Sequence, residues 1–224
     1  MTDRPAILLD LDGTLTDSVY QHALAWHKAL ELGGIKLSVW RIHRRIGMSG
    51  GLLAESLARE TGSKLSDAVA AKMRTAHARL FAAQLRNVRV LPGAKELTRH
   101  LTRMKVPWAV ATSGALASAR PLLKLVDLPS SVPIITRDDV KHAKPNPDLW
   151  LAAAARLGVA PESAICVGDS VWDLLSARRA RALGVGLLTG GYGQEELERA
   201  GAYRVYEDPA DLLLHIDEVG IRPE

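Results

Sequence analysis

The sequence predicts an α/β protein with a doubly wound, Rossmann-like parallel sheet as its core and a small all-helical domain inserted after the first strand. After residue 91, short apolar runs alternate with helical segments, which is typical of βαβ units in a parallel sheet. Residues 17–86 show helical periodicity alone. A chain of 224 residues is long enough for one core and a smaller insertion. We therefore expect the core over residues 1–16 and 87–224 and the helical domain over 17–86.

The first strand is predicted over residues 6–11, because a short apolar run there leads directly into two acidic residues. A helix is predicted from Val19 to Leu32, with Ser18 and Gln21 as a capping box at its start. The pair Gly33-Gly34 ends this helix. The inserted domain is expected to continue with helices over 38–46, 50–61 and 66–86.

Strand and helix then alternate to the end of the chain. Strands are predicted over 106–112, 132–136, 163–168, 184–190 and 202–208. Helices are predicted over 115–125, 147–157 and 171–183, with one more closing the chain.

Composition excludes several classes of protein. The chain is 47% hydrophobic and 24% charged, as in ordinary globular proteins. No apolar run is long enough to span a bilayer, and the first residues lack the layout of a signal peptide. The single cysteine, Cys166, rules out an internal disulfide and is typical of a reducing compartment. We therefore expect a cytoplasmic protein without a membrane partner, monomeric or weakly dimeric.

The basic residues do not indicate a nucleic-acid partner. The net charge is only +4, and aromatic residues make up 4% of the chain, which leaves little surface for stacking on bases. The densest basic run is "RIHRR" at 41–45. We interpret it as a solvated helix face or a contact to an anionic substrate.

Polar residues follow three of the predicted strands and one loop. Ligands of open α/β sheets bind outside the carboxyl ends of the strands, so these residues are candidates for one common site. They are Asp10 and Asp12 after the first strand, Thr112 and Ser113 after the strand over 106–112, Asp169 and Asp173 after the strand over 163–168, and Lys144 in "HAKPNPD".

Each residue alone has a structural explanation: Asp169 could cap a helix, the Thr-Ser-Gly stretch could be a turn, and Lys144 could be exposed. No turn explains Asp10, however, since a second carboxylate at the end of a buried strand is unfavourable without a compensating cation. Acids, hydroxyls and a cation at one sheet edge together favour a functional site.

The motifs "DLDGTLTDS", "ATSG", "KPNPD" and "GDSVWD" lie in this order over residues 10–173. In this they resemble the haloacid dehalogenase (HAD) superfamily, in its phosphatase and phosphomutase branch. The helical insertion after the first motif resembles the α-helical cap of that family.

The resemblance implies roles for the motif residues. Asp10 would attack phosphorus and become an aspartyl-phosphate, while Asp12 would protonate the leaving alcohol and then deprotonate water. Mg²⁺ would be held by Asp10, the backbone carbonyl of Asp12 and Asp169, with Asp173 in support. The remaining motif residues, Thr112, Ser113 and Lys144, would bind the phosphoryl oxygens.

The helical domain carries weaker signals for the substrate. His22 and Trp26 match a histidine and a tryptophan of the β-phosphoglucomutase group. For His22, a place at the site entrance and a structural role remain open, whereas core packing is favoured for Trp26. In "RRIGMSGGLL", Gly50 replaces the arginine with which β-phosphoglucomutase grips the non-transferring phosphate. Arg45 or its neighbour Arg44 could serve instead, so the tentative substrate contacts are His22, Arg45 and Ser49.

The expected function is Mg²⁺-dependent hydrolysis of a small phosphorylated metabolite, of the phosphoglycolate or sugar-phosphate kind. The alternatives are a β-phosphoglucomutase-like sugar phosphomutase and a non-catalytic binding protein of the same family. The loop lacks the lysine that phosphonoacetaldehyde hydrolases use as a Schiff base, which disfavours carbon–phosphorus cleavage. Asp12 argues against dehalogenation, since dehalogenases need no acid for their leaving group.

Overall fold

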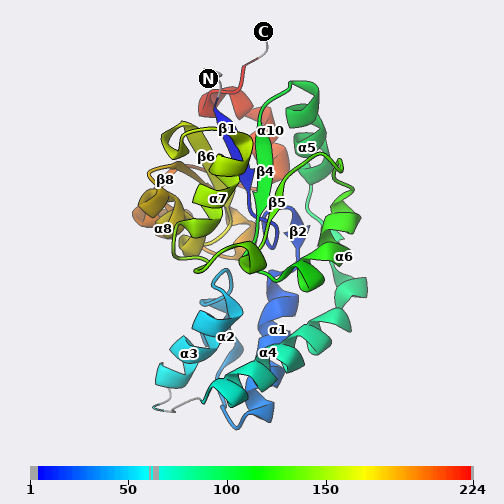
Figure 1. The fold of residues 1–224 in the computed structure, drawn as a ribbon, viewed down its shortest axis with the longest axis vertical. Helices are drawn as coiled ribbons and strands as arrows, with labels where there is room; N and C mark the ends of the chain where they lie inside the picture. Colours follow the sequence, from blue (N-terminus) through cyan, green and yellow to red (C-terminus); the bar gives the residue numbers. More distant parts are fainter. Residues whose placement is uncertain (1–4, 61, 63–65, 223–224) are drawn as a thin grey trace.

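The computed structural model describes residues 5–60, 62 and 66–222. It contains a core around a parallel sheet and a lobe of helices that lies beyond the carboxyl end of the first strand (Figure 1). The sheet has six strands in the order β5-β4-β1-β6-β7-β8, all paired in parallel. The strands are β1 (Ala6–Leu9), β4 (Trp108–Ala111), β5 (Ile134–Ile135), β6 (Ala164–Gly168), β7 (Leu183–Leu187) and β8 (Ala202–Tyr206). The predicted fold class is confirmed.

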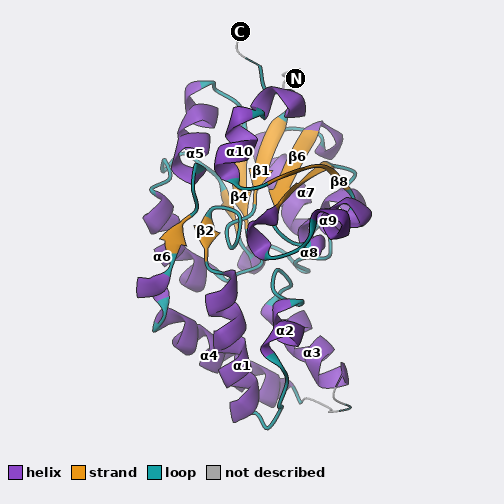
Figure 2. Ribbon diagram, turned by 180° about the vertical axis from the view of Figure 1, so that it is seen from behind, coloured by secondary structure: helices purple, strands orange, loops and turns teal. Residues whose placement is uncertain are grey.

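Helices cover both faces of the sheet (Figure 2). Successive side chains of β1 point to opposite faces, so Ile7 and Leu9 pack into one apolar cluster while Leu8 packs into the other. The core helices are α5 (Ala94–Arg103), α6 (Leu116–Val126), α7 (Asp148–Leu157), α8 (Val171–Ala180), α9 (Gln194–Ala200) and α10 (Pro209–Leu214). Short 3₁₀ turns are η1 (Leu85–Asn87), η2 (Arg137–Asp139), η3 (Pro161–Ser163), η4 (Leu188–Gly190) and η5 (Ile216–Val219).

In the described part of the helical lobe there are four helices, with an apolar cluster of their own. They are α1 (Val19–Leu32), α2 (Val39–His43), α3 (Gly50–Glu60) and α4 (Asp67–Ala82). Trp26 is buried in this cluster, as predicted. Two connections join the lobe to the core, and there β2 (Thr16–Asp17) pairs antiparallel with β3 (Arg89–Val90).

Several predicted boundaries differ from the structure. The strand over 6–11 ends at Leu9, the helix over 38–46 ends at His43, and the helix over 66–86 ends at Ala82. Thr61, the last residue of the helix predicted over 50–61, lies outside the described residues. The stretch predicted as a strand over 184–190 closes in the 3₁₀ turn η4.

Two α-helices of the described residues were not predicted. The first is α5, whose charged sequence carries only a narrow apolar stripe at Ala94, Leu97 and Leu101. The second is α9, which spans only seven residues and is too short for a clear period.

The predicted capping box at Ser18 is wrong. Ser18 is the N-cap of α1, but its side chain makes no capping bond. Its hydroxyl instead donates to Asp12 Oδ1 at 2.6 Å. This hydrogen bond directs the Ser18 side chain to Asp12 and not to the first turn of α1, so a residue expected to serve the helix lies in the candidate site.

Candidate active site

The candidate site lies where the strand order reverses. β1 is flanked by β4 on one side and β6 on the other, so the carboxyl ends of all three strands border the same crevice. Asp10 follows β1, Thr112 follows β4 and Asp169 follows β6. The Asp10 amide donates to the Val167 carbonyl at 2.9 Å, which fixes Asp10 against the end of β6.

Lys144 links two of these carboxylates. Its side chain is fully buried, and its Nζ donates to Asp10 Oδ1 and to the Ala111 carbonyl, the latter at 3.0 Å. The same nitrogen lies 2.7 Å from Asp173 Oδ1 in an ion pair. Burial opposes its charge, but Asp10 and Asp173 outweigh burial and raise the pKa of Lys144 above its ordinary value. The lysine is therefore a permanent cation at the base of the site, as the loop motif predicted.

Asp173 has a second task at the start of α8. Its Oδ2 accepts from the Ser170 amide at 3.1 Å and also from the Ser170 hydroxyl, which forms a capping box. The cap of this helix is thus Ser170, and Asp169 is free to turn toward the other carboxylates. The alternative that Asp169 caps the helix is excluded.

Three buried carboxylates form the candidate metal centre. Asp10, Asp169 and Asp173 each offer an oxygen, and these atoms all lie within 4.8 Å of one another. Burial raises the pKa of Asp10 to about 7, with Asp173 and Asp12 adding to the effect and Lys144 opposing it. Burial and the neighbouring Asp173 also raise the pKa of Asp169 well above its ordinary value. Three acids facing a single ammonium favour a further cation, and oxygen donors alone suit a hard ion such as Mg²⁺.

The backbone around Asp169 leaves no room for larger residues. A Cβ built on Gly190 would lie 2.1 Å from Asp169 Oδ2, so only glycine permits η4 to pass this close. Thr14 donates its hydroxyl to Asp169 Oδ1 at 3.2 Å from the other side. Asp169 is held in one orientation toward the cluster as a result.

The hydroxyls after β4 stand beside Asp10. Thr112 Oγ1 accepts from the Gly114 amide at 3.0 Å, which leaves its own proton free to donate. Ser113 Oγ is buried and has no hydrogen-bond partner within the described ranges. A buried hydroxyl without a partner is costly, so a ligand oxygen at this place would stabilise the site.

Asp12 belongs to a separate network that reaches into the helical lobe. His22 Nε2 lies 3.0 Å from Asp12 Oδ1, and His22 Nδ1 lies 3.0 Å from His77 Nε2 on α4. Burial acts to raise the pKa of Asp12, but the bonds from His22 and Ser18 outweigh it and hold that pKa below its ordinary value. Burial and the nearby His22 keep the pKa of His77 well below its usual range, so this ring stays neutral. His22 is thus a direct partner of Asp12.

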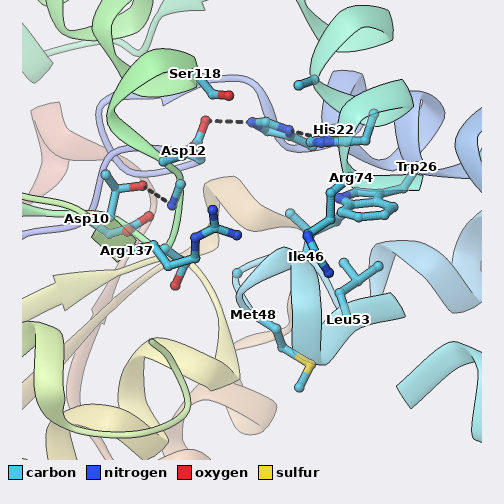
Figure 3. Close-up of a pocket in the computed structure, with 18 residues that line it drawn as sticks. Asp10, Asp12, His22, Trp26, Ile46, Met48, Leu53, Arg74, Ser118 and Arg137 are labelled. Carbon is cyan, nitrogen blue, oxygen red and sulfur yellow. Dashed lines mark hydrogen bonds and ion pairs between the residues drawn. The ribbon is translucent and has the colours of Figure 1, made fainter. Parts of the chain in front are cut away.

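Residues of both networks line the same pocket (Figure 3). The pocket has a volume of about 170 Å³, and its lining includes Asp10, Asp12, His22, Thr112 and Ser113. Among the lining residues that were not predicted, three are basic: Arg74, His77 and Arg137. They belong to an amphipathic helix and to a turn after β5, and single basic residues in such segments carry no distinguishing signal.

The structure does not bring Arg45 or Ser49 to this pocket. Arg45 lies 3.5 Å from Glu60 in an ion pair within the lobe, and the Ser49 amide donates to the Lys144 carbonyl at 3.4 Å. Neither is among the lining residues. Arg44 packs on the ring of Tyr192 at 4.1 Å and pairs with Glu196, so it joins the lobe to the core. The basic run over 41–45 therefore serves internal ion pairs.

Comparisons with known proteins agree with this geometry. A family model described as haloacid dehalogenase-like hydrolase matches residues 5–181. Hexitol phosphatase A of Escherichia coli (strain K12) is 33% identical over 175 residues, which cover 77% of this chain and 78% of that protein. Phosphoglycolate phosphatase of Rhodospirillum rubrum is 30% identical over 92% of this chain and 88% of that protein. The crystal structure of a hydrolase from Pseudomonas syringae is 49% identical, with a TM-score of 0.95 and coverage of 97% of this chain and 100% of that chain. Among the described residues, no helix has the length and apolar character needed to cross a bilayer.

Proposed function

The chain belongs to the haloacid dehalogenase-like hydrolases and is a phosphoric monoester hydrolase, and from this premise we propose that it hydrolyses a small phosphorylated metabolite with Mg²⁺ through an aspartyl-phosphate on Asp10. The observation that carries the proposal is the position of Asp10. Its carboxylate belongs to the acidic cluster and lines the same pocket as Thr112 and Ser113, whose hydroxyls can donate to a ligand. The hexitol and phosphoglycolate phosphatases among its relatives support a substrate of that size.

The proposed reaction consists of two successive displacements at phosphorus. In the first, an Asp10 oxygen forms a bond to phosphorus while the bond from phosphorus to the alcohol oxygen breaks, and Asp12 gives that oxygen a proton. In the second, water attacks the phosphorus of the aspartyl-phosphate, Asp12 takes its proton, and inorganic phosphate leaves. Throughout, Thr112, Ser113 and Lys144 would hold the phosphoryl oxygens. When bound by Asp10, Asp169 and the Asp12 carbonyl, with Asp173 in support, Mg²⁺ would neutralise charge on the phosphoryl group.

The network around Asp12 suits both of its tasks. With its pKa held low by His22 and Ser18, Asp12 is the carboxylate that accepts a proton from water. A bound phosphate brings negative charge close to this carboxylate, which raises its pKa and favours the protonated form needed in the first displacement.

We also propose that the helical lobe, residues 17–86, acts as a cap over the candidate site. Lobe residues such as His22, Trp26 and Arg74 form part of the pocket wall, and core residues form the rest. Closure of such a lobe would exclude bulk water while the phosphoryl group is transferred.

Phosphate release from a panel of phosphomonoesters, measured with and without Mg²⁺, tests the proposal. The panel contains phosphoglycolate, hexitol phosphates, pentose phosphates and β-glucose 1-phosphate with a bisphosphate primer. We expect release that disappears with a chelator and returns with Mg²⁺. Isomerised sugar phosphate without release would establish a phosphomutase instead, and Mg²⁺ binding without turnover of any ester would favour a binding protein.

Replacing Asp12 by asparagine should lower the rate by about 10²- to 10⁴-fold for alkyl phosphates, since the general acid is lost. The loss should be much smaller for p-nitrophenyl phosphate, because its leaving group needs no proton. This difference is checked by measuring the rates for both ester classes in Asp12→Asn and in the exposed control Asp17→Asn. Equal losses for both classes would remove Asp12 from the role of acid.

A further inference from the structure

Two arginines reach the pocket from opposite lobes. Arg74 lies on α4 of the helical lobe, and Arg137 begins the turn η2 after β5 of the core. Figure 3 shows both side chains directed toward the space between the lobes, with Arg137 on the side of Asp10 and Arg74 beside Trp26. Neither belongs to a motif, and neither has a part in the phosphoryl transfer described above.

Arg74 brings a positive charge to the pocket wall. Its side chain is half-buried on the pocket wall, and no carboxylate among the described residues pairs with it. Three other arginines of the lobe are paired: Arg41 and Arg45 with Glu60, and Arg44 with Glu196. The pocket's own acids are already engaged, Asp10 by Lys144 and Asp12 by His22.

Arg137 is fixed next to the hydroxyl loop. Its amide donates to the Gly114 carbonyl at 3.1 Å, which ties the turn to the segment that carries Thr112 and Ser113. Within the described part of the chain, the one carboxylate that pairs with its side chain is the exposed Asp138, at 3.7 Å. Such an ion pair contributes little, so the guanidinium is available to a ligand.

The position of Arg74 fits the leaving-group side of the reaction. His77 lies one turn further along α4, and positions three apart share a helix face. Through His22, His77 is connected to Asp12, the acid proposed to protonate the leaving alcohol. An alcohol whose oxygen is at Asp12 would therefore extend its carbon chain toward the face of α4 that carries Arg74.

Gly50 lies beside Trp26 and the stem of Arg74 on the pocket wall. A Cβ built on Gly50 would lie 3.0 Å from the Trp26 ring and 3.9 Å from Arg74 Cδ. Position 50 is where the resemblance to β-phosphoglucomutase would place an arginine. In this chain the cation enters the pocket from α4, next to the glycine.

We propose that Arg74 and Arg137 form a second anion subsite, so that the preferred substrate is a phosphomonoester whose alcohol part carries another anionic group, a carboxylate or a second phosphate. A guanidinium fork matches both groups, since each presents two oxygens in one plane. This inference rests on the proposed function and narrows its substrate class.

Matched pairs of esters test the subsite. The pairs are phosphoglycolate with hydroxyethyl phosphate, phosphoglycerate with glycerol phosphate, and phosphogluconate with sorbitol phosphate, which differ in the second anion at three chain lengths. Ethylene glycol bisphosphate tests a second phosphate in place of the carboxylate. We expect kcat/KM of the wild type to favour the anionic member of at least one pair. Preference for the neutral member in every pair, with the bisphosphate no better, would overturn the subsite while phosphate release itself stands.

Variants separate charge recognition from structure. Arg74→Gln and Arg137→Gln should each lower kcat/KM for the anionic ester by about 10- to 100-fold, the range of one charge-assisted hydrogen bond. The neutral ester of the same pair should change less than about 3-fold, and Arg74→Lys should recover part of the loss. Arg79→Gln, an exposed position on the same helix, is the matched control. Equal losses for both members of a pair would overturn the assignment of that arginine.

Binding provides a readout that does not depend on turnover. Calorimetry with Asp10→Asn should show tighter binding of phosphoglycolate than of hydroxyethyl phosphate, and this difference should vanish in Asp10→Asn/Arg74→Gln. If the wild type released no phosphate, the proposed function would fail, but the binding measurement would still test the subsite. The same difference in affinity between the two esters in Asp10→Asn/Arg74→Gln would overturn the subsite.

Discussion

Asp10→Asn is expected to lower phosphate release by about 10⁴-fold or more while leaving the protein at least as stable as the wild type above pH 7. The rate falls because an amide cannot attack phosphorus as the carboxylate does. The stability is kept because Lys144 retains Asp173 and the Ala111 carbonyl as partners. Function and stability thus place opposite demands on this position.

The direction of the stability change in Asp10→Asn follows from the pKa of Asp10. In the folded protein the pKa of Asp10 is raised from 3.8 to about 7, with burial as the main cause. Between these two values the folded state binds more protons than the unfolded state, so this group's contribution to stability falls as pH rises through the window. Asparagine carries no charge and removes that loss.

Thermal unfolding at pH 5 and pH 8, with a chelator present, checks the prediction. The melting temperature of the wild type should fall more between the two conditions than that of Asp10→Asn. Asp17→Asn, at an exposed position of β2, serves as the control. A variant that keeps a tenth of the activity, or that melts below the wild type at pH 8, would contradict the assignment of Asp10.

Lys144→Met should cost about 3–5 kcal/mol in the free energy of unfolding and abolish phosphate release. The ammonium is fully buried between Asp10 and Asp173, and methionine fills similar space without a charge. Loss of the ammonium leaves Asp10 and Asp173 buried close to one another without their cation. Leaving a buried charge unpaired is what makes the breaking of a buried ion pair destabilising.

Urea unfolding monitored by circular dichroism measures this change, with Lys141→Met, three residues away at an exposed position, as the control. Adding Asp10→Asn to Lys144→Met should restore part of the stability but none of the activity, because it removes one of the repelling charges. Equal midpoints for Lys144→Met and its control would show that the buried pair does not hold this edge together.

The sheet edge that carries the candidate site could be predicted from the sequence because its residues follow strands. An apolar run has a visible end, and the carboxyl ends of neighbouring parallel strands meet at one edge whatever the loops do. That is why Asp10, Thr112 and Asp169 were expected together before their distances were known. The structure adds the causes: Ser170 caps α8, so Asp169 is free for the cluster, and Gly190 holds it there.

The residues of the helical lobe could not be placed in the same way. Arg45 and Arg74 are both basic residues in helical segments, yet one pairs with Glu60 and the other faces the pocket. Which of them reaches the ligand depends on how α4 packs against α1 and how the lobe sits over the sheet. The capping pattern at Ser18 was misleading for a similar reason, since the Ser18 side chain donates to Asp12 and makes no bond to the first turn of α1.

The fold class and the meeting of the strand-end residues at one edge can thus be predicted from the sequence, because they follow from local apolar runs and from the geometry that all parallel sheets share. That His77 extends the Asp12 network and that Arg74 and Arg137 line one cavity is seen only in the folded chain. These contacts join residues far apart in the chain, and their positions are set by the packing of one lobe on the other, which no local pattern encodes.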